Sequence, residues 1–112
     1  MKVKLTASKD AYVLVAHLLN KVYDLPVSSI ERENVYKSIA MDLSDKFEAK
    51  SRVIKKSTSL LTFKKKADIT LKYHEAWALE QVLHDILRET TLDTYQNSLL
   101  NAFLNHLNQK LA

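Results

Sequence analysis

Residues 61–73, LTFKKKADITLKY, decide how many strands the fold contains. Apolar and polar residues alternate on both sides of three consecutive lysines, a pattern typical of two half-buried strands. The stretch predicts a hairpin whose turn covers residues 64–68. The two arms would place their apolar side chains on one side of the sheet, with Leu61 and Phe63 on the first arm and Ile69, Leu71 and Tyr73 on the second.

A further strand and two helices are predicted upstream of this hairpin. Residues 2–7, KVKLTA, also alternate and indicate a strand. Ser8 can cap a helix that runs to about Asp24 and is apolar around most of its circumference, as in a centrally buried helix. Pro26 breaks the chain. Ser28 with Glu31 fits a capping box that opens a second helix, which is expected to end near Arg52.

Two more helices follow the hairpin, at about residues 75–88 and 92–111. The chain of 112 residues is therefore predicted to be a single α+β domain, 1–112, in the order β-α-α-β-β-α-α. A small antiparallel three-stranded sheet would carry helices on one face and water on the other. The predicted core consists of Val3, Leu5, Val15, Leu18, Leu19, Val22, Ile39, Leu43, Leu71, Leu79 and Leu83.

Two segments of the chain resemble each other. VKLTASKDAYVL, from Val3, and ITLKYHEAWAL, from Ile69, align with a one-residue gap, and each is a strand that enters a helix through an acid and an alanine. Two interpretations stay open. The segments are copies that arose by internal duplication, or both obey the same rules for joining a strand to a helix.

The composition excludes many classes of site. The chain has no glycine, where about 7% is average, so phosphate-cradling loops, dinucleotide fingerprints and nucleophile elbows cannot be built. It has no cysteine, which removes disulfides and thiolate sites and favours a reducing compartment, so we expect a cytoplasmic protein. The longest apolar run, AYVLVA, is too short to cross a bilayer and no small-residue cleavage site follows it, so neither a membrane span nor a signal peptide is expected.

No catalytic or metal-binding motif is complete. His74 and Glu75 resemble the start of a zincin motif, but Ala78 stands where the second histidine is required. Glu80 and His84 share a helix face without visible third and fourth ligands. We therefore expect no enzyme, no metal and no cofactor.

The positive charge is concentrated in one part of the chain. Residues 50–72 contain eight basic residues and one acid, Asp68, whereas the rest of the chain is net acidic. The candidate surface for nucleic acid or an acidic partner consists of Arg52, Lys55, Lys56, Lys64, Lys65, Lys66 and Lys72. Lysines far outnumber arginines and the predicted open sheet face lacks aromatics, so sequence readout and base stacking are not expected. These lysines could equally be a guard against edge-to-edge aggregation.

The last helix has a second candidate surface. Its asparagines recur at helical spacing, and its apolar band is wider than a domain of this size is expected to cover. We expect a homodimer through this helix, with self-association residues Asn97, Leu100, Asn101, Leu104, Asn105 and Asn108. A solvated face is the simpler alternative.

These observations favour a non-catalytic interaction protein, a small rigid domain that self-associates and binds another protein. The alternative is a sequence-independent nucleic-acid-binding accessory protein that uses a lysine-rich hairpin and the sheet face.

Overall fold

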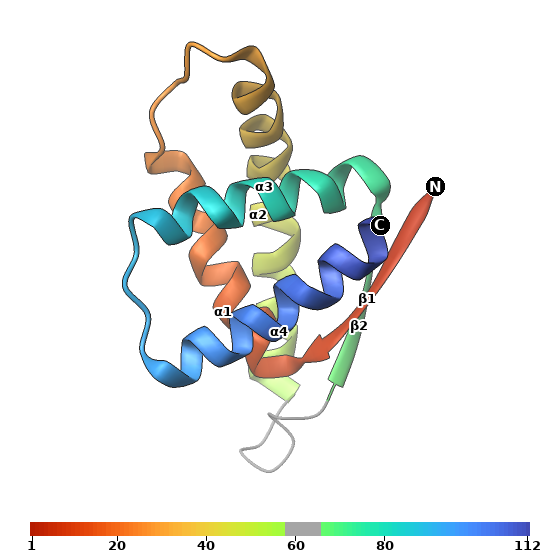
Figure 1. Cartoon of the computed structure of the whole chain (residues 1–112). Coiled ribbons are helices and arrows are strands. Elements are labelled where there is room, and N and C mark those ends of the chain that lie inside the picture. The colour runs from red at the N-terminus through yellow and green to blue at the C-terminus, as the bar shows by residue number, and fades with distance from the viewer. Residues whose placement is uncertain (58–65) are drawn as a thin grey trace.

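The structure, a computed structural model, describes residues 1–57 and 66–112 (Figure 1). The order of elements in these residues is β1 (Lys2–Ser8), α1 (Lys9–Leu19), the 3-10 helix η1 (Asn20–Asp24), α2 (Glu31–Ser57), β2 (Lys66–Lys72), α3 (Tyr73–Arg88) and α4 (Thr94–Leu111). The described part of the chain is therefore mostly helical, with a single pair of strands.

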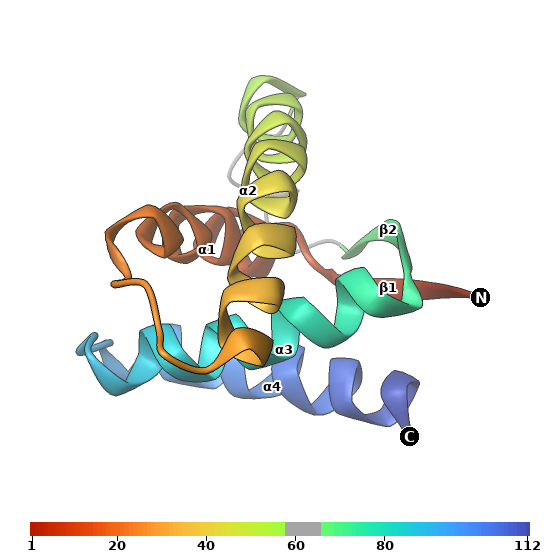
Figure 2. The same ribbon diagram turned by 90° about the horizontal axis from the view of Figure 1, so that it is seen from above.

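The two strands form an antiparallel ribbon, residues 2–8 and 66–72, with Lys2 opposite Lys72, Leu5 opposite Ile69 and Ser8 opposite Lys66. In Figures 1 and 2 the helices all lie to one side of this ribbon. Val3, Leu5, Ile69 and Leu71 point into the helices and are buried.

The prediction of a three-stranded sheet built on a hairpin is wrong. Residues 66–68, which were expected to turn, belong to β2, and β2 pairs with β1 across the whole length of both strands. The first arm with Leu61 and Phe63, and the turn lysines Lys64 and Lys65, lie outside the described residues. An alternating pattern shows which residues share a face, but it does not show which segment is the hydrogen-bonded partner. That is why the hairpin was favoured over the long-range pair.

The helix ends also differ from those predicted. The first helix stops at Leu19 and the chain continues as η1. Ser28 does not form the expected box with Glu31. Its hydroxyl donates to Glu33 (3.1 Å), and its backbone exchanges hydrogen bonds with the Asn34 amide. Helix α2 then runs past Arg52 to Ser57.

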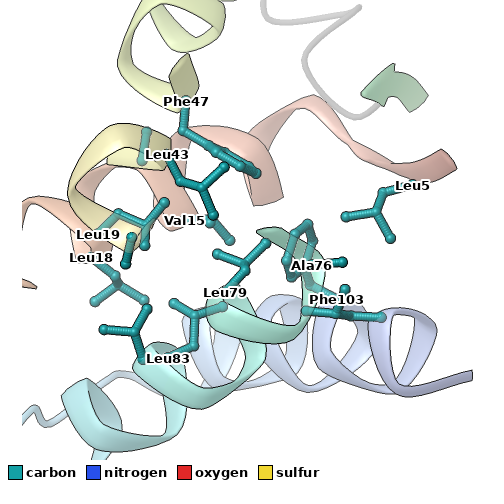
Figure 3. Packing of buried hydrophobic residues seen from close by; sticks show 14 of the residues in the cluster. Leu5, Val15, Leu18, Leu19, Leu43, Phe47, Ala76, Leu79, Leu83 and Phe103 are labelled. Atoms are coloured by element: carbon teal, nitrogen blue, oxygen red, sulfur yellow. The ribbon is translucent and has the colours of Figure 1, made fainter. Parts of the chain in front are cut away.

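Helices α1, α2 and α3 enclose most of the core. Figure 3 shows Leu43 and Phe47 of α2, and Leu79 and Leu83 of α3, converging on the side chains of α1. The predicted core is confirmed at ten of its eleven positions, and the other, Ile39, is partly buried against the same cluster. No described residue has a positive φ, as expected for a chain without glycine.

Tyr12 ties the ribbon to the helices. Its side chain is fully buried, and its hydroxyl lies 2.9 Å from the carbonyl oxygens of both Leu5 and Ala67, which share its one proton. Its ring lies 6.1 Å from that of Phe47 and 6.2 Å, edge-on, from that of Phe103. One residue of α1 therefore contacts both strands, α2 and α4. Burial also raises the pKa of the Tyr12 hydroxyl, which keeps it a donor at any physiological pH.

The two halves of the chain repeat the order strand, helix, helix. They are related by an offset of 64 positions, the separation of Lys2 from Lys66 where the two strands begin. Leu5 and Ile69 are equivalent at this offset and also face each other in the ribbon, as residues on a two-fold axis would. The ribbon therefore has an approximate two-fold axis through this pair.

Burial supports the same offset without any gap. The six buried residues of α3, Ala76, Ala78, Leu79, Val82, Leu83 and Ile86, correspond to Tyr12, Leu14, Val15, Leu18, Leu19 and Val22, which are all buried. The four buried residues of α4, Leu100, Phe103, Leu104 and Leu107, correspond to Tyr36, Ile39, Ala40 and Leu43, of which three are buried and Ile39 packs against the core. The sequence alignment, which matched Val3 to Ile69 and, after its gap, Asp10 to Glu75, was displaced by two residues in the strands and by one in the helices. A shift of two leaves the alternation of a strand unchanged, so the pattern could not reveal it.

We expect Tyr12→Phe to lower the free energy of unfolding by about 1–2 kcal/mol, because two strand carbonyls lose a buried donor while the aromatic packing stays. Tyr23→Phe is the matched control. The Tyr23 hydroxyl also donates to a backbone carbonyl, that of Met41, but the residue is exposed, so a change of no more than about 0.5 kcal/mol is expected. Urea denaturation of both variants measures the difference. Equal losses in the two would contradict the role given to Tyr12.

Candidate nucleic-acid interface

The side of the ribbon that points away from the helices is polar and strongly basic. We call it the open face. Its side chains are Lys2, Lys4, Thr6 and Ser8 from β1, and Lys66, Asp68, Thr70 and Lys72 from β2. Alternation of the two strands sends these residues outward, while Val3, Leu5, Ile69 and Leu71 are buried and Ala7 and Ala67 are half-buried. Four lysines and one aspartate thus occupy a surface that is two strands wide.

One end of the open face concentrates the positive charge. Lys2 lies directly opposite Lys72, and Lys46 of α2 joins them around a depression of about 300 Å³ that Thr70, Leu71 and Glu75 also line. Glu75 accepts a hydrogen bond from the backbone N–H of Lys72 at 2.8 Å and so caps the start of α3. Like charges placed opposite each other destabilise an antiparallel pair. The fold therefore bears a small cost for this cluster of ammonium groups.

Two lysines of α2, Lys46 and Lys50, bind the outer edge of β2. Their Nζ atoms donate to the carbonyl oxygens of Thr70 (3.1 Å) and Asp68 (2.8 Å). Lys50 Nζ also lies 5.9 Å from the centre of the Tyr12 ring. A neutral carbonyl does not neutralise an ammonium group, and each group keeps two further N–H donors, although Lys50 also attracts the nearby Asp68 carboxylate. These edge lysines are thus held in place without losing their charge.

The outer edge of β1 is covered from the other side. The backbone N–H of Thr6 donates to Nε2 of His106, on α4, at 3.3 Å. Thr6 and Thr70 are equivalent at the offset of 64. Helix α4 of the second half bonds to Thr6 of β1, and helix α2 of the first half bonds to Thr70 of β2. Covered edges protect a ribbon from pairing with another chain. Protection of the edges therefore does not depend on the lysines of the open face.

Asp68 is the one acid on the open face. It accepts a hydrogen bond from Thr6 Oγ1 at 2.6 Å, and its other oxygen lies 3.4 Å from Lys4 Nζ. The hydrogen bond from Thr6, followed by the contact with Lys4, holds the pKa of Asp68 below its ordinary value. Its carboxylate is therefore ionised at neutral pH and can only accept hydrogen bonds.

The predicted basic residues do not all lie together. Lys66 and Lys72 lie at opposite ends of the open face. Arg52, Lys55 and Lys56 are exposed on the last turns of α2, where Arg52 is paired with Glu48 at 2.7 Å. The other two predicted lysines, Lys64 and Lys65, lie outside the described residues.

Sequence reasoning left four basic residues out of the candidate site. The alternation of residues 2–7 predicts that Lys2 and Lys4 face the open side of the sheet, but the candidate site was centred on the predicted hairpin. Lys46 and Lys50 were missed. Their spacing of one helical turn was visible, but it gave no sign that α2 would pass along β2.

The predicted self-association residues fall into two groups. Leu100 and Leu104 are only 2% and 8% exposed within the chain itself, so α4 uses them to pack on its own core. This packing accounts for the wide apolar band from which a homodimer was predicted. All four asparagines are exposed, and two of them also make hydrogen bonds, Asn97 to the carbonyl oxygen of Leu92 and Asn108 to Glu80. The homodimer stays a prediction that rests on the exposed asparagines.

Other polar clusters in the described residues serve packing between helices. Tyr36 of α2 donates to Asp85 of α3, and Asp85 also contacts Arg88 at 3.5 Å. The ring of Tyr36 meets Trp77 edge-on, with Arg32 above the indole ring. Desolvation, followed by the bond to Asp85, raises the pKa of Tyr36 and keeps its hydroxyl protonated. In residues 1–57 and 66–112 no group of His, Asp and Glu side chains is arranged to hold a metal ion.

Comparison with known proteins gives no relative. No protein-family profile, curated protein or solved structure matches the chain. Within the described part of the chain, none of the helices combines the length and apolarity needed to span a membrane. Arguments about function therefore rest on the geometry of the open face.

We expect Lys72→Gln to raise the free energy of unfolding by about 0.5 kcal/mol at low salt, because it removes the repulsion from Lys2 and a cation at the N-terminus of α3. Lys66→Gln is the control, since Lys66 faces the uncharged Ser8 and should give almost no change. Thermal and urea unfolding at low salt and at 1 M salt would measure both. A loss of stability in Lys72→Gln at low salt would show that the ammonium groups do not repel each other.

Proposed function

We propose that the chain is a non-catalytic DNA-binding module that places the open face of its ribbon in the major groove of a duplex. The observation that carries the proposal is the cluster of Lys2, Lys72 and Lys46 at one end of a solvent-exposed, two-stranded antiparallel ribbon. Two-stranded ribbons are one of the elements that the major groove, about 12 Å wide, admits. Strands about 4.8 Å apart, with their side chains, fit that width.

The chemistry of the open face favours a duplex over a single strand. Proteins that bind single strands stack bases on exposed aromatic side chains, and all eight residues of the open face are Lys, Thr, Ser or Asp. The major groove of an RNA duplex is too deep and narrow for side chains to read. A DNA duplex presents instead phosphates for the lysines and a groove floor for short polar side chains.

Phosphate contacts supply most of the affinity in this proposal. The edge lysines Lys46 and Lys50 flank the ribbon, where the phosphates that border the groove would lie, and their bonds to backbone carbonyls fix them in advance. Arg52, Lys55 and Lys56 extend the positive charge along α2.

Elements other than the ribbon and α2 are proposed to contribute structure. The lysines are point charges without the planar fork of arginine, so sequence preference is expected to be modest. We propose a cytoplasmic location, which the absence of cysteine favours.

We expect the chain to bind a duplex of arbitrary sequence at 50 mM salt, with an affinity that falls steeply as salt rises. The slope of log affinity against log salt changes by about 0.9 for each phosphate contact on duplex DNA. The double variant Lys2→Gln/Lys72→Gln should therefore bind more weakly, with a slope shallower by about 1.8. Fluorescence anisotropy with a labelled 20-base-pair duplex, and with one of its strands alone, would measure both slopes and the preference for the duplex.

The matched control is Lys21→Gln/Lys37→Gln, which removes the same net charge. Lys21 donates to Thr90 and Lys37 to the carbonyl oxygen of Pro26, so both lie outside the ribbon. The control should bind as the wild type does, apart from a small uniform effect of net charge. No duplex binding by the wild type at 50 mM salt, or equal losses in the two double variants, would contradict the proposal.

A further inference from the structure

The two-fold relation of the ribbon is broken at two positions of the open face. Residues related by the offset of 64 are identical in two cases, Lys2 with Lys66 and Thr6 with Thr70. They differ in the other two, Lys4 with Asp68 and Ser8 with Lys72. The first difference exchanges a hydrogen-bond donor of charge +1 for an acceptor of charge −1.

The exchange makes the two ends of the open face unlike each other. From one end to the other, the facing pairs are Lys2 with Lys72, Lys4 with Thr70, Thr6 with Asp68, and Ser8 with Lys66. Two ammonium groups stand at the first pair, and a carboxylate stands at the third. The charge of the open face therefore runs from strongly positive to mixed along the ribbon.

A DNA duplex distinguishes such a ribbon from a symmetric one. The local two-fold axes of B-DNA would let a symmetric ribbon bind equally well in either orientation at a self-complementary site. Lys4 and Asp68 occupy equivalent positions on the two sides of the ribbon's two-fold axis. In a self-complementary site they would therefore face two base pairs that are related by the two-fold axis of the DNA. One half of the site must then offer a hydrogen-bond acceptor to Lys4, and the other half must offer a hydrogen-bond donor to Asp68.

The major groove presents base groups that suit Lys4 and different base groups that suit Asp68. Guanine presents the acceptors O6 and N7, which suit the Lys4 ammonium. The donors in the groove are the amino groups of cytosine and adenine, and these suit the Asp68 carboxylate. Asp68 is well placed for this contact, because Thr6 and Lys4 use only part of its acceptor capacity, and its side chain is exposed. Against a phosphate, or against guanine O6, the same carboxylate would be repelled.

Building on the proposed function, we propose that the ribbon binds a non-palindromic duplex site in one orientation, with Lys4 on a guanine in one half and Asp68 on a cytosine or adenine amino group in the other. Asp68 is the residue that determines the orientation. The modest sequence preference expected of a lysine-rich face then comes mainly from Asp68. Its carboxylate disfavours bases that present an acceptor more than it favours bases that present an amino group.

Selection from duplexes with a randomised centre tests this inference. For the wild type, the enriched sequences should not be self-complementary. The wild type should bind the selected site about tenfold more tightly than either palindrome built by duplicating one half of it. Asp68→Lys restores the two-fold relation with Lys4, so it should prefer the palindrome built from the half that Lys4 contacts.

Asp68→Asn is the second variant. It keeps the size of the side chain and removes the charge, so it should lose most of the tenfold preference while still binding duplexes. Circular dichroism and thermal melting would establish that both variants are folded. A palindromic selected site, or equal binding of the selected site and both palindromes by the wild type, would overturn the inference and leave the proposed function standing. Failure of the wild type to bind any duplex at 50 mM salt would overturn both.

Discussion

The antiparallel pairing of β1 with β2 is the contact on which the rest of the structure depends. It joins residues 2–8 to residues 66–72, so one strand from each half of the chain meets at the Leu5–Ile69 pair. A two-stranded ribbon is marginal by itself in water and needs a packed face. Here that face is provided by four inward residues, Val3, Leu5, Ile69 and Leu71. Tyr12 of α1 bonds to a carbonyl oxygen of each strand from the helix side of the ribbon. Once the strands pair, α1 and α3 are fixed at the ends where their strands finish.

The same pairing explains why one surface is left for a ligand. The helices cover the inner face, and side chains from α2 and α4 satisfy outer-edge groups of β2 and β1. What stays exposed is the open face, with its lysines in opposing and neighbouring positions. A guard against aggregation would not require this arrangement, because side chains from α2 and α4 already bond to outer-edge groups of both strands and the opposing Lys2 and Lys72 repel each other. Binding of a polyanion would explain why the lysines are clustered on the open face and why the repulsion between Lys2 and Lys72 is tolerated.

Much of the fold could be predicted from periodicity, and the largest failure, that of the sheet, has a single cause. The buried positions of β1, α1 and α3 were predicted correctly because apolar spacing reports burial directly. Partner choice in a sheet is a long-range property, so Ile69 and Leu71 were recognised as strand residues but were assigned to a hairpin with Leu61 and Phe63. The resemblance between the halves was noticed with the strands two residues, and the helices one residue, away from the structural register. Of the site, Lys66 and Lys72 were selected from charge density, whereas Lys46 could be found only from the passage of α2 along β2.

The central claim is that the open face of the ribbon is where DNA binds, and nuclear magnetic resonance tests it most directly. A ¹⁵N-labelled chain would be titrated with a short duplex at low salt, and the shift of each backbone amide followed. The account predicts that the largest shifts fall on residues 2–8 and 66–72 and on the part of α2 that carries Lys46 and Lys50, with α3 beyond its first turn nearly unaffected. Large shifts confined to the exposed asparagine side of α4, or to the α2–α3 face around Trp77, with an unperturbed ribbon, would contradict it.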